Sequence, residues 1–347
     1  MTKPSDSPAP GFVCSRRRAL RIVAGSIGIA TLPRAAFGKP AVASPPLHRW
    51  EGKALGAEGT ILLYHPDATY ARTLLDGCVR EIERLESLFS LYRPDSVLCR
   101  LNRTGRLAAP PEDFRRLLIT AKEWHQRTAG AFNIGVQPLW ELYARHFAMP
   151  TADPTGPAPS AIAHARGLAD IEGVCITREE IFLKKAGMAL TLNGIAQGYI
   201  TDRVAEFLKT QGMRHVLVEL GEFRAIAARP DGRPWRIGIA NPDRPWRAIR
   251  TLPLREGAIA TSGSYGMPFE PTVRHHHLFD PFTGRSANHH RSVTVLAPEA
   301  TTADALSTAL AILPQADGER LLAELDEVGA VFLNAQGAVF VNVQSVE

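Results

Sequence analysis

The sequence predicts an α+β fold in which mixed, largely antiparallel sheets are flanked by helices. Short runs with the apolar alternation typical of strands outnumber the runs with helical periodicity. Several of these runs are separated only by short segments of turn-forming residues, so neighbours along the chain are expected to pair as antiparallel hairpins. These two features favour an α+β fold over a doubly wound parallel sheet.

The predicted strands are short and most end at a glycine or a polar turn. Residues 174–177 and 181–184 flank a polar turn, and Gly221 and Gly337 mark two further hairpins. A Pro-Asp-Gly turn at 230–232 precedes another strand. In chain order the strands are expected at 59–64, 174–177, 181–184, 188–192, 216–220, 224–227, 235–239, 258–264, 292–296, 330–333 and 339–342.

Helices are expected where apolar residues recur three and four positions apart. The first ends at Phe89, and Asp95 or Ser96 is placed to cap the short helix that follows. Asp113 begins a further helix, and Pro138 suits the first turn of the next one. The helical segments contain residues 79–89, 100–102, 113–130, 138–143, 195–208 and 303–313.

The stretch 188–212 combines a predicted strand, a tight turn and a helix. Apolar residues alternate up to Leu192, Asn193-Gly194 breaks the strand, and helical spacing continues until Gly212. Free N–H groups at the start of such a helix suit a phosphate group. The same residues also fit an ordinary strand-to-helix connection.

The first 43 residues have the organisation of an export signal. Arg16 and Arg17 lie in a charged segment, the moderately apolar run 22–32 follows, and Ala41-Val-Ala43 offers a cleavage site. Paired arginines are typical of twin-arginine signals, so we expect a periplasmic protein. A disordered basic tail is the alternative, and cleavage near Gly38 also fits.

Residues 44–347 are expected to form the mature domain, in one or two lobes. Four prolines between residues 149 and 160 indicate a surface linker or insertion. The signal holds seven of the 40 Lys and Arg residues and one of the 35 acidic ones, so the mature chain has a net charge of −1. The composition therefore gives no indication of nucleic-acid binding. No later run is long and apolar enough to span a membrane.

Asp304 and Thr308 are candidates for a metal site. They lie four residues apart on a predicted helix, so their oxygen atoms share one face. A carboxylate and a hydroxyl both suit Mg²⁺, which usually also keeps waters and substrate phosphates as ligands. The alternative is an Asp favoured by the helix dipole in the first turn and a Thr that faces solvent.

Two groups of adjacent histidines, 275–277 and 289–290, are candidates for transition-metal binding. Adjacent residues of an extended chain point to opposite faces, so solvated loops are the preferred interpretation for most of them. One histidine in the loop before Asp280 is a better candidate for acid–base chemistry. The sequence has no Walker A motif, no dinucleotide fingerprint and no nucleophile elbow.

Six groups of residues then follow one another along the mature chain. They are Phe89-Ser-Leu-Tyr92 with 95–96 and 100–102, Thr128-Ala-Gly-Ala-Phe-Asn133, Asn193-Gly-Ile-Ala-Gln-Gly-Tyr199 with 202–203, Ala260-Thr-Ser-Gly263, His277-Leu-Phe-Asp-Pro-Phe-Thr-Gly284 and Ala303-Asp-Ala-Leu-Ser-Thr308. Each is weakly specific by itself. In this order they resemble the ApbE family, whose members are FAD:protein FMN transferases.

The resemblance implies an FAD site and Mg²⁺. Such enzymes cleave the FAD pyrophosphate and attach FMN through a phosphoester to a Thr or Ser of an acceptor flavoprotein. Asp304 and Thr308 match Mg²⁺ ligands, Gly194 matches a position that supplies a backbone carbonyl, and His277 matches a histidine that assists transfer. The positions that match FAD contacts are Leu55, Tyr92, Ala131, Phe132, Asn133, Thr191, Gln197 and Phe279.

Three positions depart from the family pattern, which usually has Asp at Thr191, Lys at Gln197 and Asp at Asn133. A Gln in place of Lys removes a cation beside the diphosphate. The Asn-Gly-Ile-Ala-Gln-Gly form and the twin-arginine signal are similar to the NosX-like branch, which serves nitrous oxide respiration. This similarity implies a NosR-like membrane flavoprotein as the acceptor.

Two other functions fit some of the residues. Thr191 and Gln197 leave open a non-catalytic periplasmic FAD-binding accessory protein. The histidine clusters leave open a copper-handling protein.

Overall fold

The computed structural model describes residues 20–22, 44–244, 246–334 and 336–341. Most of the predicted signal therefore lies outside the described residues. Its strand β1 (Leu20–Ile22) pairs with β9 (Trp235–Ala240). Within the described ranges, no helix has the length and apolar character needed to cross a membrane.

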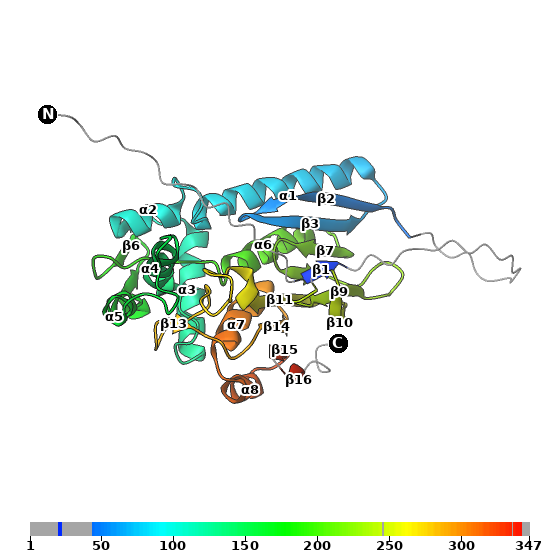
Figure 1. The fold of residues 1–347 in the computed structure, drawn as a ribbon. Coiled ribbons are helices and arrows are strands. Elements are labelled where there is room, and N and C mark those ends of the chain that lie inside the picture. Colours follow the sequence, from blue (N-terminus) through cyan, green and yellow to red (C-terminus); the bar gives the residue numbers. More distant parts are fainter. Residues whose placement is uncertain (1–19, 23–43, 245, 335, 342–347) are drawn as a thin grey trace, which may run out of the picture.

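A central sheet of eight strands organises the molecule (Figure 1). The strands are β2 (Leu47–Ala54), β3 (Ala57–Tyr64), β7 (Val216–Glu219), β8 (Phe223–Ala225), β11 (Gly257–Gly263), β14 (Ser292–Ala297), β15 (Gly329–Asn334) and β16 (Gly337–Val341). Their order is β16-β15-β14-β11-β8-β7-β3-β2, and every neighbouring pair is antiparallel. The predicted α+β fold is confirmed.

Both faces of this sheet are covered. Helices α1 (Ala68–Phe89), α6 (Ala196–Thr210) and α7 (Ala300–Ile312) pack on one face, and β9 with β10 (Ala248–Leu254) packs on the other. Ile61 and Leu63 of β3 belong to the core beside the helices, whereas Leu62 contacts the β9–β10 side. Successive side chains of a strand point to opposite faces, so these strands are apolar on both sides.

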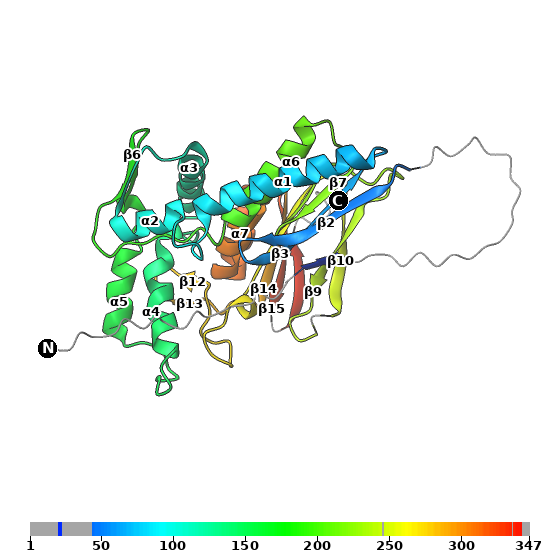
Figure 2. The ribbon, with the colours of Figure 1, turned by 90° about the horizontal axis from the view of Figure 1, so that it is seen from above.

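The other helices gather at one end of the sheet, at the left of Figure 2. They are α2 (Val97–Thr104), α3 (Glu112–Arg127), α4 (Gln137–Phe147) and α5 (Pro159–Leu168). The remaining elements are β4 (Arg106–Ala108), β5 (Val174–Ile176), β6 (Glu180–Leu183), β12 (Phe279–Asp280), β13 (Arg285–Ser286), α8 (Gln315–Ala323) and 3₁₀ turns at Ile134–Val136, Ile171–Gly173 and Ser264–Gly266. The proline-rich segment 149–160 forms turns between α4 and the start of α5.

Several elements were not predicted from the sequence: β2, β10, α5 and α8. β2 and β10 lie at sheet edges, where charged residues and prolines are common and obscure the alternation. Of the two possible caps of α2, the structure uses Ser96, whose Oγ accepts a hydrogen bond from Cys99 N–H at 3.0 Å.

The predicted strand at 188–192 is wrong. This segment is largely buried, but it forms no strand and pairs with no neighbouring strand. The Asn102 side chain instead bonds both backbone groups of Leu190, at 2.8 Å each. Thr191 N–H donates to the Ile134 carbonyl oxygen at 2.8 Å. A side chain and a loop thus satisfy backbone groups that a sheet would otherwise satisfy.

Helices α6 and α7 are joined closely at their N-terminal halves. A Cβ atom at Gly198 would lie 2.3 Å from the Ala300 carbonyl oxygen, so only glycine allows this approach. The Asp202 carboxylate of α6 accepts hydrogen bonds from the N–H groups of Ala300 and Thr301, at 2.9 and 2.7 Å. This cap comes from another helix, which explains why α7 begins before the predicted residue 303.

Burial raises the pKa of Asp202, and its hydrogen bonds to the start of α7 and the nearby Arg224 oppose that rise.

Candidate active site

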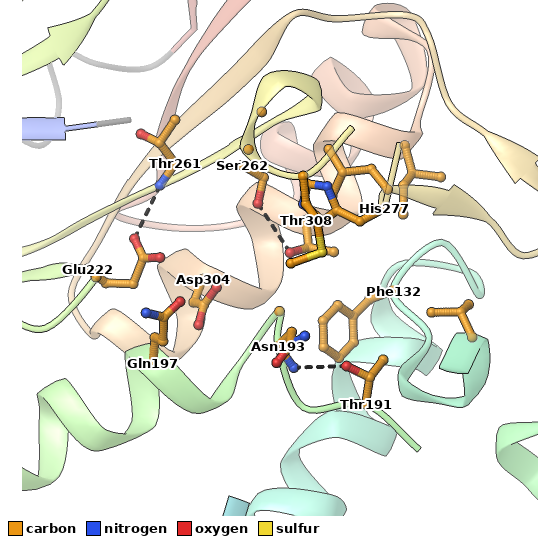
Figure 3. A pocket seen from close by; sticks show the side chains of 18 of the residues that line it. Phe132, Thr191, Asn193, Gln197, Glu222, Thr261, Ser262, His277, Asp304 and Thr308 are labelled. Carbon is orange, nitrogen blue, oxygen red and sulfur yellow. Dashed lines mark hydrogen bonds between the residues drawn. The ribbon is translucent and has the colours of Figure 1, made fainter. Parts of the chain in front are cut away.

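A pocket lies where the beginning of α6, the length of α7 and the end of β11 meet the loop that contains His277 (Figure 3). Its walls come from segments that are distant in the sequence, so only the folded chain brings them together. The predicted site residues that line it are Phe132, Asn133, Thr191, Gly194, Gln197, His277, Phe279, Asp304 and Thr308.

Three residues that were predicted to contact FAD lie outside this lining. Ala131 is fully buried, whereas Tyr92 is 53% exposed. Leu55 is buried in the turn between β2 and β3, where its N–H donates to the Glu86 carboxylate. The first two residues of β3, Ala57 and Glu58, do line the pocket.

Oxygen atoms cluster where α7 faces the pocket. Asp304 is only 3% exposed, and its Oδ2 accepts a hydrogen bond from Gly198 N–H at 2.9 Å. Thr308 Oγ1 lies 3.2 Å from Ser262 Oγ, which also lies 2.8 Å from Ser307 Oγ. The alternative placed the Asp in the first turn of the helix, but α7 begins at Ala300, so Asp304 lies beyond that turn.

The turn at Gly194 lies directly against this cluster. A Cβ atom at residue 194 would be 2.8 Å from Thr308 Oγ1 and 3.2 Å from its methyl group. Glycine leaves room here for the backbone to approach the oxygen atoms of α7. The backbone at Gly194, Thr308 and Asp304 thus form one side of the pocket.

The start of α6 offers fewer free donors than the sequence predicts. Ala196 N–H bonds the Leu192 carbonyl oxygen at 2.8 Å, and Tyr199 N–H bonds Ile195 at 3.0 Å. Gly198 N–H bonds Asp304, as described above. Three of the first four N–H groups of this helix therefore bond to protein oxygen atoms rather than facing a phosphate.

Two buried glutamates of the β7–β8 turn were missed by the sequence analysis. Glu219 and Glu222 are 3% and 7% exposed, and both line the pocket. Glu222 accepts a hydrogen bond from Thr261 N–H at 3.3 Å, where β11 extends beyond its pairing with β8. The sequence feature that could have revealed them is the presence of charged residues at the end of an otherwise apolar strand.

Gln197 packs against the same turn. Its amide donates to the Leu220 carbonyl oxygen at 3.4 Å. Gly221 has a φ of 103°, and a Cβ atom there would lie 2.2 Å from the Gln197 amide nitrogen. The glycine therefore serves both the backbone conformation and the close packing of Gln197.

The pocket carries a strongly acidic lining. Four carboxylates line it, from Glu58, Glu219, Glu222 and Asp304, and the described residues of the lining include no Lys or Arg. Carboxylates repel an anionic ligand. A cation beside such a ligand would offset this repulsion.

The loop that contains His277 is fixed through its neighbour His276. Ser286 Oγ accepts from His276 N–H at 2.8 Å and donates to His276 O at 2.7 Å. His276 Nδ1 accepts a hydrogen bond from Leu278 N–H at 3.3 Å, which requires that this nitrogen carry no proton. Burial lowers the pKa of His276 to about 4, so its ring is neutral at neutral pH.

The histidine groups do not form a metal centre in the part of the chain that the structure describes. No set of three or more His, Cys, Asp or Glu side chains there is arranged to hold a metal ion. His275 and His276 are buried, and the His290 ring lies 3.0 Å from the Leu313 carbonyl oxygen. These contacts favour a structural role for the buried histidines.

The model of the ApbE family matches residues 55–332, which includes every residue of the pocket. The chain belongs to the ApbE family.

Two curated ApbE relatives resemble the chain over most of their length. It is 31% identical to the FAD:protein FMN transferase of Vibrio cholerae over 279 residues, 78% of this chain and 82% of that protein. It is 33% identical to the FAD:protein FMN transferase of Haemophilus influenzae over 244 residues, 67% of this chain and 70% of that protein.

Solved ApbE structures share the fold. The flavin transferase ApbE from Vibrio cholerae superposes with a TM-score of 0.73 at 29% identity, covering 87% of this chain and 99% of that one. The ApbE protein of Thermotoga maritima gives a TM-score of 0.76 at 26% identity, with coverage of 87% and 99%.

The neutral state of His276 predicts a loss of stability in mild acid. Unfolded histidine has a pKa of about 6.5, whereas that of folded His276 is about 4. As the pH falls below about 6.5, the unfolded state takes up a proton that the folded state excludes, so the free energy of unfolding decreases until about pH 4. We expect His276→Gln, which cannot titrate, to reduce the fall of the thermal midpoint between pH 7 and pH 5.

The exposed His289 provides the matched control, since His289→Gln should retain the pH dependence of the wild type. Equal pH dependence in His276→Gln and the wild type would contradict the prediction.

Proposed function

We propose that this pocket binds FAD together with Mg²⁺ and passes FMN to a Thr or Ser hydroxyl of an acceptor flavoprotein. As an ApbE member 31% and 33% identical to FAD:protein FMN transferases, the chain is an FAD:protein FMN transferase.

The acidic lining of the pocket is the main observation in favour of a bound divalent cation. The FAD diphosphate is an anion, and the four carboxylates around the pocket repel it. A divalent cation at the α7 oxygen cluster offsets this repulsion. Mg²⁺ prefers oxygen ligands and keeps several waters or phosphate oxygens, so it needs only a few protein donors.

The donor set at α7 fits such an ion. The Asp304 carboxylate supplies the formal negative charge, and the Thr308 hydroxyl and the Gly194 carbonyl supply neutral oxygen atoms. The absence of a side chain at Gly194 leaves this backbone beside Thr308. When bound, Mg²⁺ supplies positive charge that stabilises the leaving phosphate.

In the proposed reaction the acceptor hydroxyl oxygen forms a bond to the FMN phosphorus. The bond from that phosphorus to the bridging oxygen of the diphosphate breaks, and AMP leaves with the bridging oxygen. His277 accepts the hydroxyl proton, and no electrons are transferred. A positioned general base of this kind typically contributes about 10²–10⁴-fold to the rate.

Gln197 and Thr191 are consistent with this use of the pocket. Gln197 supports the turn of Glu219 and Glu222 rather than contributing a charge. Thr191 Oγ1 accepts a hydrogen bond from Asn193 N–H at 3.3 Å, next to the Gly194 turn. We assign both residues to holding the FAD site in shape, with Asn133, Phe132 and Phe279 as further FAD contacts.

Features of the sequence support a proposal for the acceptor and the compartment. The Asn-Gly-Ile-Ala-Gln-Gly form of residues 193–198 and the paired arginines support membership of the NosX-like branch. The acceptor we propose is accordingly a NosR-like membrane flavoprotein of nitrous oxide respiration. The twin-arginine signal supports export to the periplasm, where that acceptor would be modified.

Transfer is tested by weighing the acceptor. We expect the purified chain, mixed with FAD, Mg²⁺ and the flavin-binding domain of a NosR-like protein, to add one FMN, less one water, to the acceptor. Mass spectrometry of the acceptor and release of AMP measure the reaction, and omission of Mg²⁺ is the control. Flavin binding without an added mass would favour an accessory protein, and copper binding without flavin would favour a metal carrier.

The metal ligands are tested by substitution. We expect Asp304→Asn to lower FMN transfer by about 100-fold or more, because it removes the formal charge from the proposed Mg²⁺ site. Asn retains an oxygen atom for the Gly198 N–H, so the thermal midpoint should change little. Thr308→Ala should cost less than Asp304→Asn, and Thr308→Ser should transfer nearly normally. A normal rate and an unchanged Mg²⁺ requirement in Asp304→Asn would remove this residue from the mechanism.

Export is tested in cells. We expect replacement of both Arg16 and Arg17 by Lys to leave the precursor in the cytoplasm, because the twin-arginine machinery recognises the arginine pair. Immunoblots of periplasmic and cytoplasmic fractions measure the distribution. Unchanged periplasmic levels, or export in a strain without that machinery, would refute this route.

A further inference from the structure

Asn102 lies on α2, outside the pocket lining, yet it holds the loop that leads into the pocket. Its Nδ2 donates to the Leu190 carbonyl oxygen and its Oδ1 accepts from Leu190 N–H, both at 2.8 Å. We infer that Asn102 is a positioning residue that fixes the Gly194 turn for metal and FAD binding. This inference rests on the proposed function of that turn.

The amide of Asn102 replaces a neighbouring strand. Leu190 is fully buried, so water cannot satisfy its two backbone groups. A carboxamide offers one donor and one acceptor side by side, which match the C=O and N–H of Leu190.

Hydrogen bonds along the next residues connect the position of Leu190 to that of Gly194. Thr191 N–H is held by the Ile134 carbonyl oxygen, and Asn193 N–H by Thr191 Oγ1. The chain then reaches Gly194, where a Cβ would come within 2.8 Å of Thr308 Oγ1. A shift of the loop would therefore change the distance between the backbone at Gly194 and the oxygen atoms of α7.

Asn102 is itself rigidly placed. The Ser96 hydroxyl caps the first turn of α2, and Gly105 ends the helix with a φ of 69°. Leu98 and Leu101 of the same helix are fully buried in the main core. Asn102 thus belongs to the group of helices at one end of the central sheet, whereas the loop that it holds leads to α6 and α7.

Mg²⁺ is sensitive to such placement because it requires nearly octahedral coordination. Groups that orient metal ligands without touching the metal typically change metal affinity by about 10–100-fold when replaced. Loss of Asn102 should accordingly raise the Mg²⁺ requirement more than it changes recognition of the acceptor.

The test compares Asn102→Ala with Asn334→Ala. Asn334 Oδ1 accepts hydrogen bonds from the N–H groups of Gln336 and Gly337 in the β15–β16 turn. It is therefore also an asparagine that bonds the backbone of a loop, but it lies outside the pocket lining. We expect Asn102→Ala to raise the Mg²⁺ concentration for half-maximal transfer by about tenfold or more. The acceptor KM should stay within about twofold of the wild type, since the change acts through the metal site.

Further measurements separate positioning from general destabilisation. Hydrogen exchange of residues 188–194 should quicken in Asn102→Ala, and FAD affinity measured by flavin fluorescence should weaken. High Mg²⁺ should restore much of the transfer rate of Asn102→Ala but not that of Asp304→Asn, which lacks a ligand. Asn334→Ala should lower the thermal midpoint with the Mg²⁺ requirement and FAD affinity unchanged.

An Asn102→Ala variant with a lower thermal midpoint but an unchanged Mg²⁺ requirement and FAD affinity would overturn the inference. A wild-type protein that transfers FMN at full rate without a divalent cation would instead refute the proposed metal site, and the inference with it. The two failures are therefore distinguished by the behaviour of the wild type.

Discussion

The contact between α6 and α7 at Gly198 is the constraint on which the pocket depends. A Cβ at this position would lie 2.3 Å from the Ala300 carbonyl oxygen, so the two helices can approach only because residue 198 is glycine. Asp202 ties α6 to the N-terminus of α7, and the Gly198 N–H bonds Asp304 one turn further along. The same contact therefore packs the helices and orients the carboxylate that faces the pocket.

Charge is distributed unevenly around these helices. The guanidinium of Arg224 lies 3.5 Å from Asp202, and that of Arg203 lies 3.9 Å from Asp113, outside the pocket lining. The pocket itself retains carboxylates without a Lys or Arg among its described lining residues. Since like charges repel, an anionic ligand would bind beside these carboxylates more favourably together with a cation.

The loops that border the pocket are ordered by side chains rather than by sheet pairing. Asn102 bonds both backbone groups of Leu190, and the Ser286 hydroxyl bonds both backbone groups of His276. Such bonds satisfy the backbone of each loop, so that one loop can place Gly194 and the other His277 at the pocket. Rigid elements position functional loops in this way in many enzymes.

The amino-acid sequence by itself determined the α+β class, most strands and helices, and the ordered motifs whose resemblance to the ApbE family singled out Asp304, Thr308 and His277. Periodicity and turn residues encode these features locally, and motif order links them. It did not reveal the acidic pair Glu219 and Glu222, because burial of a charge depends on distant packing. The apolar alternation at 188–192 predicted a strand, but a strand needs a partner. Only the tertiary structure decided that an asparagine 88 residues away would take the partner's place, because hydrogen bonds between distant segments leave no periodic signal in the sequence.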